Sequence, residues 1–270
     1  MFIKNKYKLI FIYFLIVLES IFLSNTFSST LEQKGLEIAR RMEKANESYI
    51  GELSITKMIL IDAYGNKIVR NLRGKSLEVK GDGDKSLSIF MNPQDVKGTK
   101  MLTWSHKHKD NDQWLYLPAL RRVKRISSRN KSASFMGSEF TYEDLGSQEI
   151  EKYKFKFVKL DTLKNFPGIN FEVIEKIPKN KSGYSKQRLW VHPKYHSPVK
   201  VEYYDRKKEL LKIAQMTNFN SFNVNGKNFW RSGKIHMKNV QTRKESIFEW
   251  VKRKLGVKLK SADFDKQSLK

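Results

Sequence analysis

The sequence has 270 residues, no cysteine and a formal net charge of +25 from 53 basic and 28 acidic residues. The lack of cysteine excludes disulfides, and it excludes a lipobox for attachment of an acyl anchor. The charge alone would suit a nucleic-acid-binding protein, but 40 of the basic residues are lysines, whereas arginine supplies the bidentate hydrogen bonds that read phosphates and bases. We therefore expect no nucleic-acid partner; the lysines form either a solvated surface or one attracted to anionic lipid head groups.

Residues 1–28 have the pattern of a cleavable signal peptide. Three lysines within the first eight residues precede the apolar stretch Leu9–Leu18, which is too short to span a bilayer. The alternative is an uncleaved N-terminal anchor, because Ile21–Leu23 extends the apolar character. We expect export from the cytoplasm without lipidation, and a single mature domain at residues 29–270.

One amphipathic helix is predicted at the start of the mature domain, from about Leu31 to Glu47. Thr30 and Gln33 match a capping box, and the apolar residues that follow recur at helical spacing as far as Ala45. One apolar face of this helix should therefore pack against the rest of the protein.

Almost all of the remaining chain alternates apolar and polar residues with the period of a β-strand. In KYKFKFVKL (152–160) three aromatic residues alternate with lysines, and VKVEYY (199–204) repeats the pattern. Turn signals such as Asn225-Gly226 separate about 11 short strands, with no helices between them to connect parallel strands. The sequence therefore predicts a mainly β protein whose single antiparallel sheet curls to protect its edges.

The stretch QWLYLP (113–118) is apolar on both faces of its strand. Trp114 and Tyr116 lie on one face, and Leu115 and Leu117 lie on the other. A sheet with one solvated face does not need this pattern. Either another part of the chain packs over the second face, or that face lines a cavity for an apolar ligand.

No group of residues points to catalysis, to a metal or to a cofactor. His106 and His108 lie beside an evident turn, and the spacing of His192 and His196 is interrupted by Pro193. Nucleophile elbows, P-loops and dinucleotide fingerprints are absent. We therefore predict a protein that is not an enzyme and has no cofactor, with a hydrolase built on the acidic pair of residues 143 and 144 as a weaker alternative.

An acidic segment directly follows the most basic one. SASFMGSEFTYEDLGSQEIE (132–151) contains five acidic residues and no basic ones, and it follows RRVKRISSRNK (121–131). We expect it to fold back across the basic strand, where Glu139, Glu143 and Asp144 would neutralise the charges. Exposed pairs contribute only about 0–1 kcal/mol each, so they would position the loop rather than stabilise the fold. Its apolar side chains would cover the mouth of the concave sheet or, alternatively, pack as ordinary core.

Several blocks of sequence resemble the LolA-like family of outer-membrane lipoprotein-sorting proteins. The resemblance runs in order from about Leu31 to Leu269 and is carried by NPQDVKGTKML, DQWLYLPALRRVKRISS, KSASFMGSEFTYEDL, YYDRKKELLK and ADFDKQSL. It implies a half-open antiparallel β-barrel whose open side is covered by an N-terminal helix and lid helices or loops, around a hydrophobic cavity for acyl chains. It also implies residence in the periplasm.

The resemblance leads to a functional hypothesis. We expect a carrier that shields acyl chains of a lipoprotein or another lipid, with an RND-type (MMPL-like) exporter in the inner membrane and an outer-membrane acceptor as partners. A periplasmic lipid sensor of the RseB kind is the alternative. The residues expected to form the cavity or its lid are Trp104, Trp114, Tyr116, Leu117, Phe135, Met136, Phe140 and Tyr142. The basic surface expected to meet an anionic head group or a partner comprises Arg121, Arg122, Lys124 and Arg125.

Overall fold

The computed structural model describes residues 30–269. The predicted signal peptide lies outside the described residues. Within residues 30–269, no helix is both long enough and apolar enough to cross a membrane. The N-terminal helix spans residues 30–46, in agreement with its predicted position.

All thirteen strands of the described residues belong to one antiparallel sheet. The strands are β1 (Gly51–Ile61), β2 (Lys67–Leu77), β3 (Lys85–Asn92), β4 (Lys100–Trp104), β5 (Asp112–Leu117), β6 (Arg122–Ile126), β7 (Tyr153–Leu163), β8 (Phe166–Pro178), β9 (Lys186–His192), β10 (Ser197–Tyr204), β11 (Leu210–Val224), β12 (Lys227–Asn239) and β13 (Glu245–Leu255). Their order in the sheet is β6-β5-β4-β3-β2-β1-β13-β12-β11-β10-β9-β8-β7.

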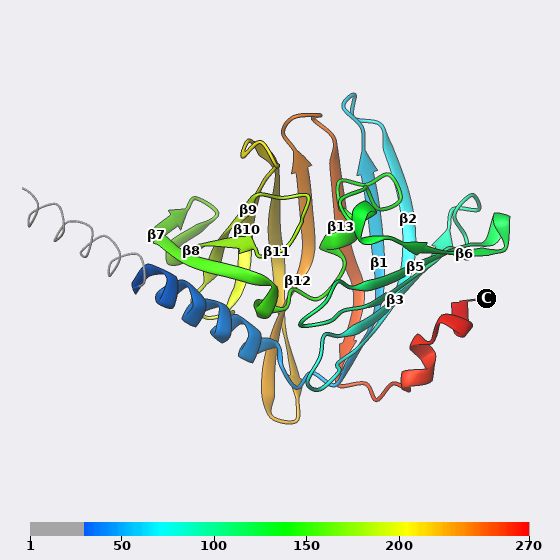
Figure 1. Ribbon diagram of the computed structural model, residues 1–270, viewed down its shortest axis with the longest axis horizontal. Coiled ribbons are helices and arrows are strands. Elements are labelled where there is room, and N and C mark those ends of the chain that lie inside the picture. Colours follow the sequence, from blue (N-terminus) through cyan, green and yellow to red (C-terminus); the bar gives the residue numbers. More distant parts are fainter. Residues whose placement is uncertain (1–29, 270) are drawn as a thin grey trace, which may run out of the picture.

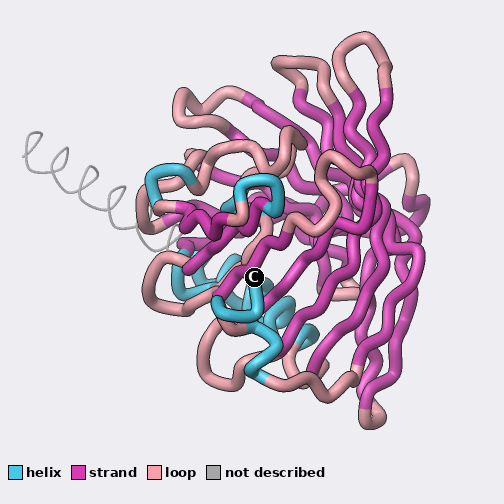
Figure 2. Tube along the Cα trace, turned by 90° about the vertical axis from the view of Figure 1, so that its right-hand side faces the viewer, coloured by secondary structure: helices cyan, strands magenta, loops and turns pink. Residues whose placement is uncertain are grey.

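This order leaves the sheet open. The chain runs outward from β1 to one edge at β6, crosses to the opposite edge at β7, and returns strand by strand to β13, which pairs with β1. Figure 1 shows the two edge strands on opposite sides of the molecule, and Figure 2 shows the strands curving around the irregular segments. The prediction of a mainly β, half-open antiparallel barrel is confirmed.

The sheet has two more strands than the predicted eleven, because some of its turns carry no glycine or asparagine signal. The β9–β10 turn spans residues 193–196 and the β12–β13 turn spans residues 240–244. His196 and Arg243 adopt positive φ angles of 44° and 61° in these turns, a conformation that glycine and asparagine adopt more readily.

The N-terminal helix covers the inner face of one half of the sheet. Ile38 and Ala39 are 1% and 2% exposed, and they pack with Phe155 and Phe157 of β7 and with inward residues of β8–β11. The lysines that alternate with these phenylalanines are exposed, so the pattern of KYKFKFVKL is confirmed. Figure 1 shows the helix crossing in front of this half.

The C-terminal segment covers the outer face of the other half. Two 3₁₀ helices, Ser261–Phe264 and Lys266–Leu269, place Phe264 and Leu269 against Leu87, Leu102 and Trp114, and both residues are fully buried. The inner side of the same strands holds a different cluster, which includes Leu115. Both faces of QWLYLP are therefore buried by other parts of the chain, which was the first of its two interpretations.

We predict that Gly35→Ala destabilises the protein. A Cβ at residue 35 would lie 2.7 Å from backbone atoms of Lys156 and Phe157, so the helix would have to move away from β7. Helix propensity alone would make this substitution stabilising by about 1 kcal/mol, whereas overpacking costs about 1–3 kcal/mol. Urea unfolding should show a net loss of stability, and Glu37→Ala on the exposed side of the helix should show none. A more stable Gly35→Ala protein would contradict the close packing.

Candidate functional site

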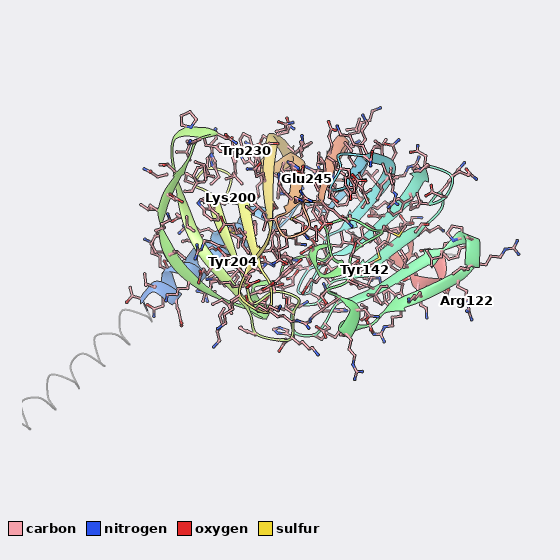
Figure 3. All side chains as sticks on the ribbon, turned by 90° about the horizontal axis from the view of Figure 1, so that it is seen from above. Arg122, Tyr142, Lys200, Tyr204, Trp230 and Glu245 are labelled. Atoms are coloured by element: carbon pink, nitrogen blue, oxygen red, sulfur yellow. The ribbon has the colours of Figure 1, made fainter. Side chains whose placement is uncertain are left out.

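The chain between β6 and β7 fills the inner face of the half that the N-terminal helix leaves uncovered. We call residues 127–152 the β6–β7 segment. Its Phe135, Phe140 and Tyr142 are 1%, 5% and 9% exposed. The ring centroid of Phe135 lies 5.9 Å from that of Phe90 on β3, and the ring of Phe140 lies 4.6 Å from that of Phe248 on β13. Figure 3 shows Tyr142 among the strands.

Side chains of the sheet hold the backbone of this segment at separate points. Arg70 Nη1 on β2 donates to the carbonyl oxygen of Met136 at 2.6 Å. Gln113 Nε2 on β5 donates to the carbonyl oxygen of Tyr142 at 2.8 Å. The segment forms only short 3₁₀ turns and one isolated β-bridge, between Ser134 and Thr141. Side-chain contacts therefore determine its position more than a backbone ladder does.

The most buried of these contacts is an ion pair between Lys212 of β11 and Asp144. Lys212 Nζ lies 2.8 Å from Asp144 Oδ2 and also donates to the carbonyl oxygen of Glu139 at 2.7 Å. The two side chains are only 2% and 7% exposed. Tyr184 donates its hydroxyl to the same carboxylate at 3.0 Å, and the backbone N–H of Thr141 donates to it at 2.7 Å. A buried pair needs such additional hydrogen bonds to offset its lost hydration.

Two more acids of the segment, Glu143 and Glu139, also bind the far half of the sheet. Glu143 accepts hydrogen bonds from the Ser182 hydroxyl and from the backbone N–H of Gly183, while burial raises the pKa of this carboxyl group. Glu139 accepts a hydrogen bond from Asn239 Nδ2 at 2.7 Å. The acidic segment thus bridges the open sheet.

The expectation that these acids neutralise the basic strand is wrong. Among the four residues of the predicted basic surface, Arg125 pairs with Asp112 of the neighbouring strand β5. The side chains of Arg121, Arg122 and Lys124 are exposed, and Figure 3 shows Arg122 at the far side of the molecule from the N-terminal helix. Asp144 pairs instead with Lys212, because a buried cation attracts a carboxylate more strongly than solvated arginines do.

A second buried lysine lies beside the end of the segment. Lys176 of β8 is 5% exposed, and its Nζ donates to Gln148 Oε1 at 2.6 Å. Its ammonium group also lies 4.2 Å from the ring centroid of Tyr153. Burial lowers the pKa of Lys176 to about 7, although the nearby carboxylates Asp144 and Glu143 oppose the shift.

The predicted cavity and lid residues fall into two groups on opposite faces of the sheet. Leu117, Phe135, Met136, Phe140 and Tyr142 belong to the inner clusters. Trp104, Trp114 and Tyr116 lie on the outer face under the C-terminal segment, where Trp104 Nε1 donates to the carbonyl oxygen of Phe264 at 2.8 Å. The two groups therefore do not line one common cavity.

Two hollows lie elsewhere. One of about 150 Å³ is mostly polar and lies where the two ends of the β6–β7 segment come together, between the β4–β5 and β8–β9 turns. The other, of about 370 Å³, is an open groove on the outer face, lined mainly by Ile55, Met91 and Val251 with Lys57 and Arg73 beside them. None of the predicted cavity residues lines either hollow.

One acidic group has the spacing of a metal site. Carboxylate oxygens of Glu43, Glu149 and Glu151 lie within 4.8 Å of one another. Lys107 Nζ, however, lies 3.7 Å from Glu43 and 3.5 Å from Glu151, so a lysine already supplies positive charge there. His106 likewise contacts Asp82 and Asp112 rather than a second histidine.

The sequence analysis did not identify Lys212 or Lys176 as residues of the site. A signal existed, because Lys212 alternates with the buried Ala214, and Lys176 alternates with the buried Ile174. A lysine at the inward positions of a strand indicates a buried cation that needs a partner. Which segment supplies that partner cannot be read from strand periodicity.

Comparisons with known proteins agree on the fold. A protein-family model described as "Uncharacterized protein" matches residues 82–270. No curated protein sequence matches this chain. The solved structure of a domain from Vibrio parahaemolyticus, described as an outer membrane lipoprotein-sorting protein domain, is 46% identical with a TM-score of 0.84, over 88% of this chain and 99% of that chain.

Two more solved structures are similar. A DUF1329 family protein from Desulfovibrio piger is 27% identical with a TM-score of 0.81, over 89% of this chain and 99% of that chain. A LolA superfamily protein from Nitrosomonas europaea is 18% identical with a TM-score of 0.67, over 87% and 98% of the two chains, and it supports the fold alone.

We predict that Asp144→Asn loosens the β6–β7 segment. The substitution leaves Lys212 buried without its carboxylate, and breaking such a pair costs about 3–5 kcal/mol. Hydrogen exchange of residues 132–151 should accelerate strongly. Asp263→Asn, which removes a part-exposed ion pair with Lys75, should cost about 0–1 kcal/mol and leave the segment's exchange unchanged. Unaltered exchange in Asp144→Asn would show that the pair does not hold the segment.

We predict that Lys176 makes stability depend on pH. The pKa of Lys176 is about 7 in the folded chain and ordinarily 10.5. At pH values between these two, Lys176 carries a proton in the unfolded chain but has lost it in the folded chain. The free energy of unfolding therefore rises with pH in this window. From about pH 7 to 9.5 this group adds up to about 3 kcal/mol.

The test compares the wild type with Lys176→Met at both pH values by urea unfolding. The variant should lose this increase, whereas Lys254→Met, at an exposed lysine, should retain it. Equal pH dependence in all three proteins would mean that Lys176 stays charged when buried.

Proposed function

Because this chain belongs to the LolA-like family of outer-membrane lipoprotein-sorting proteins, we propose that it is a periplasmic carrier for the acyl chains of a lipoprotein or another lipid. The observation that carries the proposal is the apolar inner face of the open sheet, which is covered by a segment rather than by strands. Phe135, Phe140 and Tyr142 occupy the place that an acyl chain would take.

In this proposal the β6–β7 segment is a displaceable lid. In the closed state its aromatic side chains bury inner-face residues such as Met58, Leu72 and Phe90. When the segment swings away, the same surface becomes available to a hydrocarbon chain. The segment suits this movement because it is held by side-chain contacts rather than by a backbone ladder, and it lacks long secondary structure.

The energies favour exchange over permanent binding. An acyl chain of about sixteen carbons gains about 13 kcal/mol on burial, at about 0.8 kcal/mol per methylene. Exposing the three aromatic side chains of the lid costs about 5–9 kcal/mol, and association itself costs at least about 4 kcal/mol. Moving the segment would also break the buried Lys212–Asp144 pair, at about 3–5 kcal/mol. Gains and costs then nearly cancel, so an acyl chain that is taken up can be released again.

The wider setting is part of the proposal. The family suggests movement of the cargo toward the outer membrane, with an RND-type exporter and an outer-membrane acceptor as partners. We propose no catalytic role. Asp144 is bound by Lys212 and Tyr184, and Glu143 is bound by Ser182, so the acidic pair considered for a hydrolase is already engaged in structural contacts.

We predict that Phe135→Ala raises the affinity for an acyl chain while it lowers the free energy of unfolding of the ligand-free protein. Truncation removes a side chain that competes with the ligand, and a buried Phe→Ala change costs the closed state about 3–5 kcal/mol. Affinity for a fluorescent fatty acid should rise at least about tenfold.

Phe171→Ala is the matched control. Phe171 is also fully buried, but it lies in a separate cluster with Val173, Trp190 and Val199. This variant should lose stability without gaining affinity. If the wild type and both variants fail to bind fatty acid, and native mass spectrometry of the purified protein detects no lipid, the carrier function is wrong.

A further inference from the structure

The polar hollow between the two ends of the lid is rich in lysines. It has a volume of about 150 Å³, and the ends of both edge strands contribute to it, through Ile126 of β6 and Tyr153 of β7. Five lysines line it: Lys107, Lys109, Lys131, Lys152 and Lys181. Three acidic residues, Asp110, Glu143 and Glu151, line it as well.

Each of these acids already has a partner. Asp110 lies 3.0 Å from Lys131 Nζ, and Glu151 lies 3.5 Å from Lys107 Nζ. Glu143 accepts the two hydrogen bonds from Ser182 and Gly183. Lys109 pairs with Asp112, which lies outside the lining, at 3.6 Å. Among residues 30–269 this leaves Lys152 and Lys181 without an ion-pair partner, so the hollow keeps an excess of positive charge.

Lys152 is a partly buried lysine of this hollow that lacks an ion-pair partner among residues 30–269. Its Nζ donates to the neutral Asn111 Oδ1 at 2.6 Å, and within residues 30–269 no carboxylate lies within ion-pair distance of it. Burial lowers the pKa of Lys152, although the carboxylates of Glu149, Asp110 and Asp82 oppose the shift and the charge of Lys131 adds to it. An ammonium has three hydrogen-bond donors, so a partly buried one with a single amide partner has donors to spare.

We propose that this hollow binds a phosphate group, and that the phosphate belongs to the head group of the carried lipid. Lysines act as point charges toward phosphate, and Lys131 and Lys152 would contact it together. The inference rests on the proposed carrier function: the two ends of the segment, which carry Lys131 and Lys152, stay beside the edge strands while its aromatic middle part gives way to the acyl chain.

The position of the hollow connects the head group to the lid. Ser147, Gln148 and Glu151 line it and belong to the β6–β7 segment, and Gln148 also accepts the hydrogen bond from the buried Lys176. A phosphate bound between Lys131 and Lys152 therefore meets both ends of the segment. Lipids that carry phosphate would be preferred over neutral lipids with the same chains.

The test uses two probes on the wild type, Lys152→Gln and Lys254→Gln, an exposed lysine of β13 that serves as a charge-matched control. The first probe is glycerol 3-phosphate, titrated by NMR with glycerol as the reference. The second compares phosphatidylglycerol with diacylglycerol of the same chain length in displacing a fluorescent fatty acid. Lys152→Gln should weaken binding of glycerol 3-phosphate about tenfold, and it should abolish the preference for phosphatidylglycerol. The control should change neither.

The outcomes separate this inference from the carrier function. If glycerol 3-phosphate does not bind, or if Lys152→Gln binds it as well as the wild type does, the phosphate site is wrong, even if diacylglycerol binds. Glycerol 3-phosphate could bind through Lys152 while phosphatidylglycerol displaces the fatty acid no better than diacylglycerol does. The proposal that the phosphate belongs to a lipid head group would then be wrong, and the site would bind a soluble phosphate compound. If neither lipid binds, the carrier function fails, and the first probe still decides whether the site exists. A thermal unfolding curve of Lys152→Gln excludes loss of binding through misfolding.

Discussion

The structure depends on one constraint: an open, strongly curved sheet cannot bury its own inner face. Strands β6 and β7 end the sheet on opposite sides and are not paired with each other, so no closed barrel forms around the interior. The inward residues are nevertheless apolar, and apolar surface of this extent must be removed from water. The N-terminal helix covers one half, and the β6–β7 segment covers the other. The two covers meet where Phe140 of the segment joins the cluster of the helix, and Phe248 packs with both clusters.

The two covers are attached by different means, and this difference bears on function. The helix packs closely enough that Gly35 admits no Cβ against the backbone of β7. The segment instead relies on Arg70, Gln113 and the buried Lys212–Asp144 pair. Buried ion pairs contribute little net stability but specify geometry, because an unpaired partner is expensive to leave in the interior. A cover held in this way has a defined closed position that depends on side-chain contacts.

The proposed phosphate site lies at the edge of the sheet and depends on the same requirement, that a buried charged group needs a partner. The hollow lies where the two edge strands are bridged by the segment, and its lysines are only partly neutralised. A ligand with an apolar chain and an anionic end would pack its chain against the inner face and pair its charge with the lysines of the hollow. The high lysine content of the chain then has two parts: a solvated majority, such as the exposed Lys154 and Lys156 of β7, and a few lysines whose burial demands a partner.

The sequence by itself determined most of the helix and strand positions. Helical spacing located the N-terminal helix, and alternation located buried faces such as Phe155 and Phe157, because these patterns are properties of local backbone geometry. Only the tertiary structure decided which segment covers which face. Trp114 and Leu115 are equally apolar neighbours, yet one packs under the C-terminal segment and the other under the β6–β7 segment. Asp144 meets Lys212 of β11 rather than the adjacent basic strand, because pairing across 68 residues depends on sheet order and on burial, and neither is encoded in local periodicity.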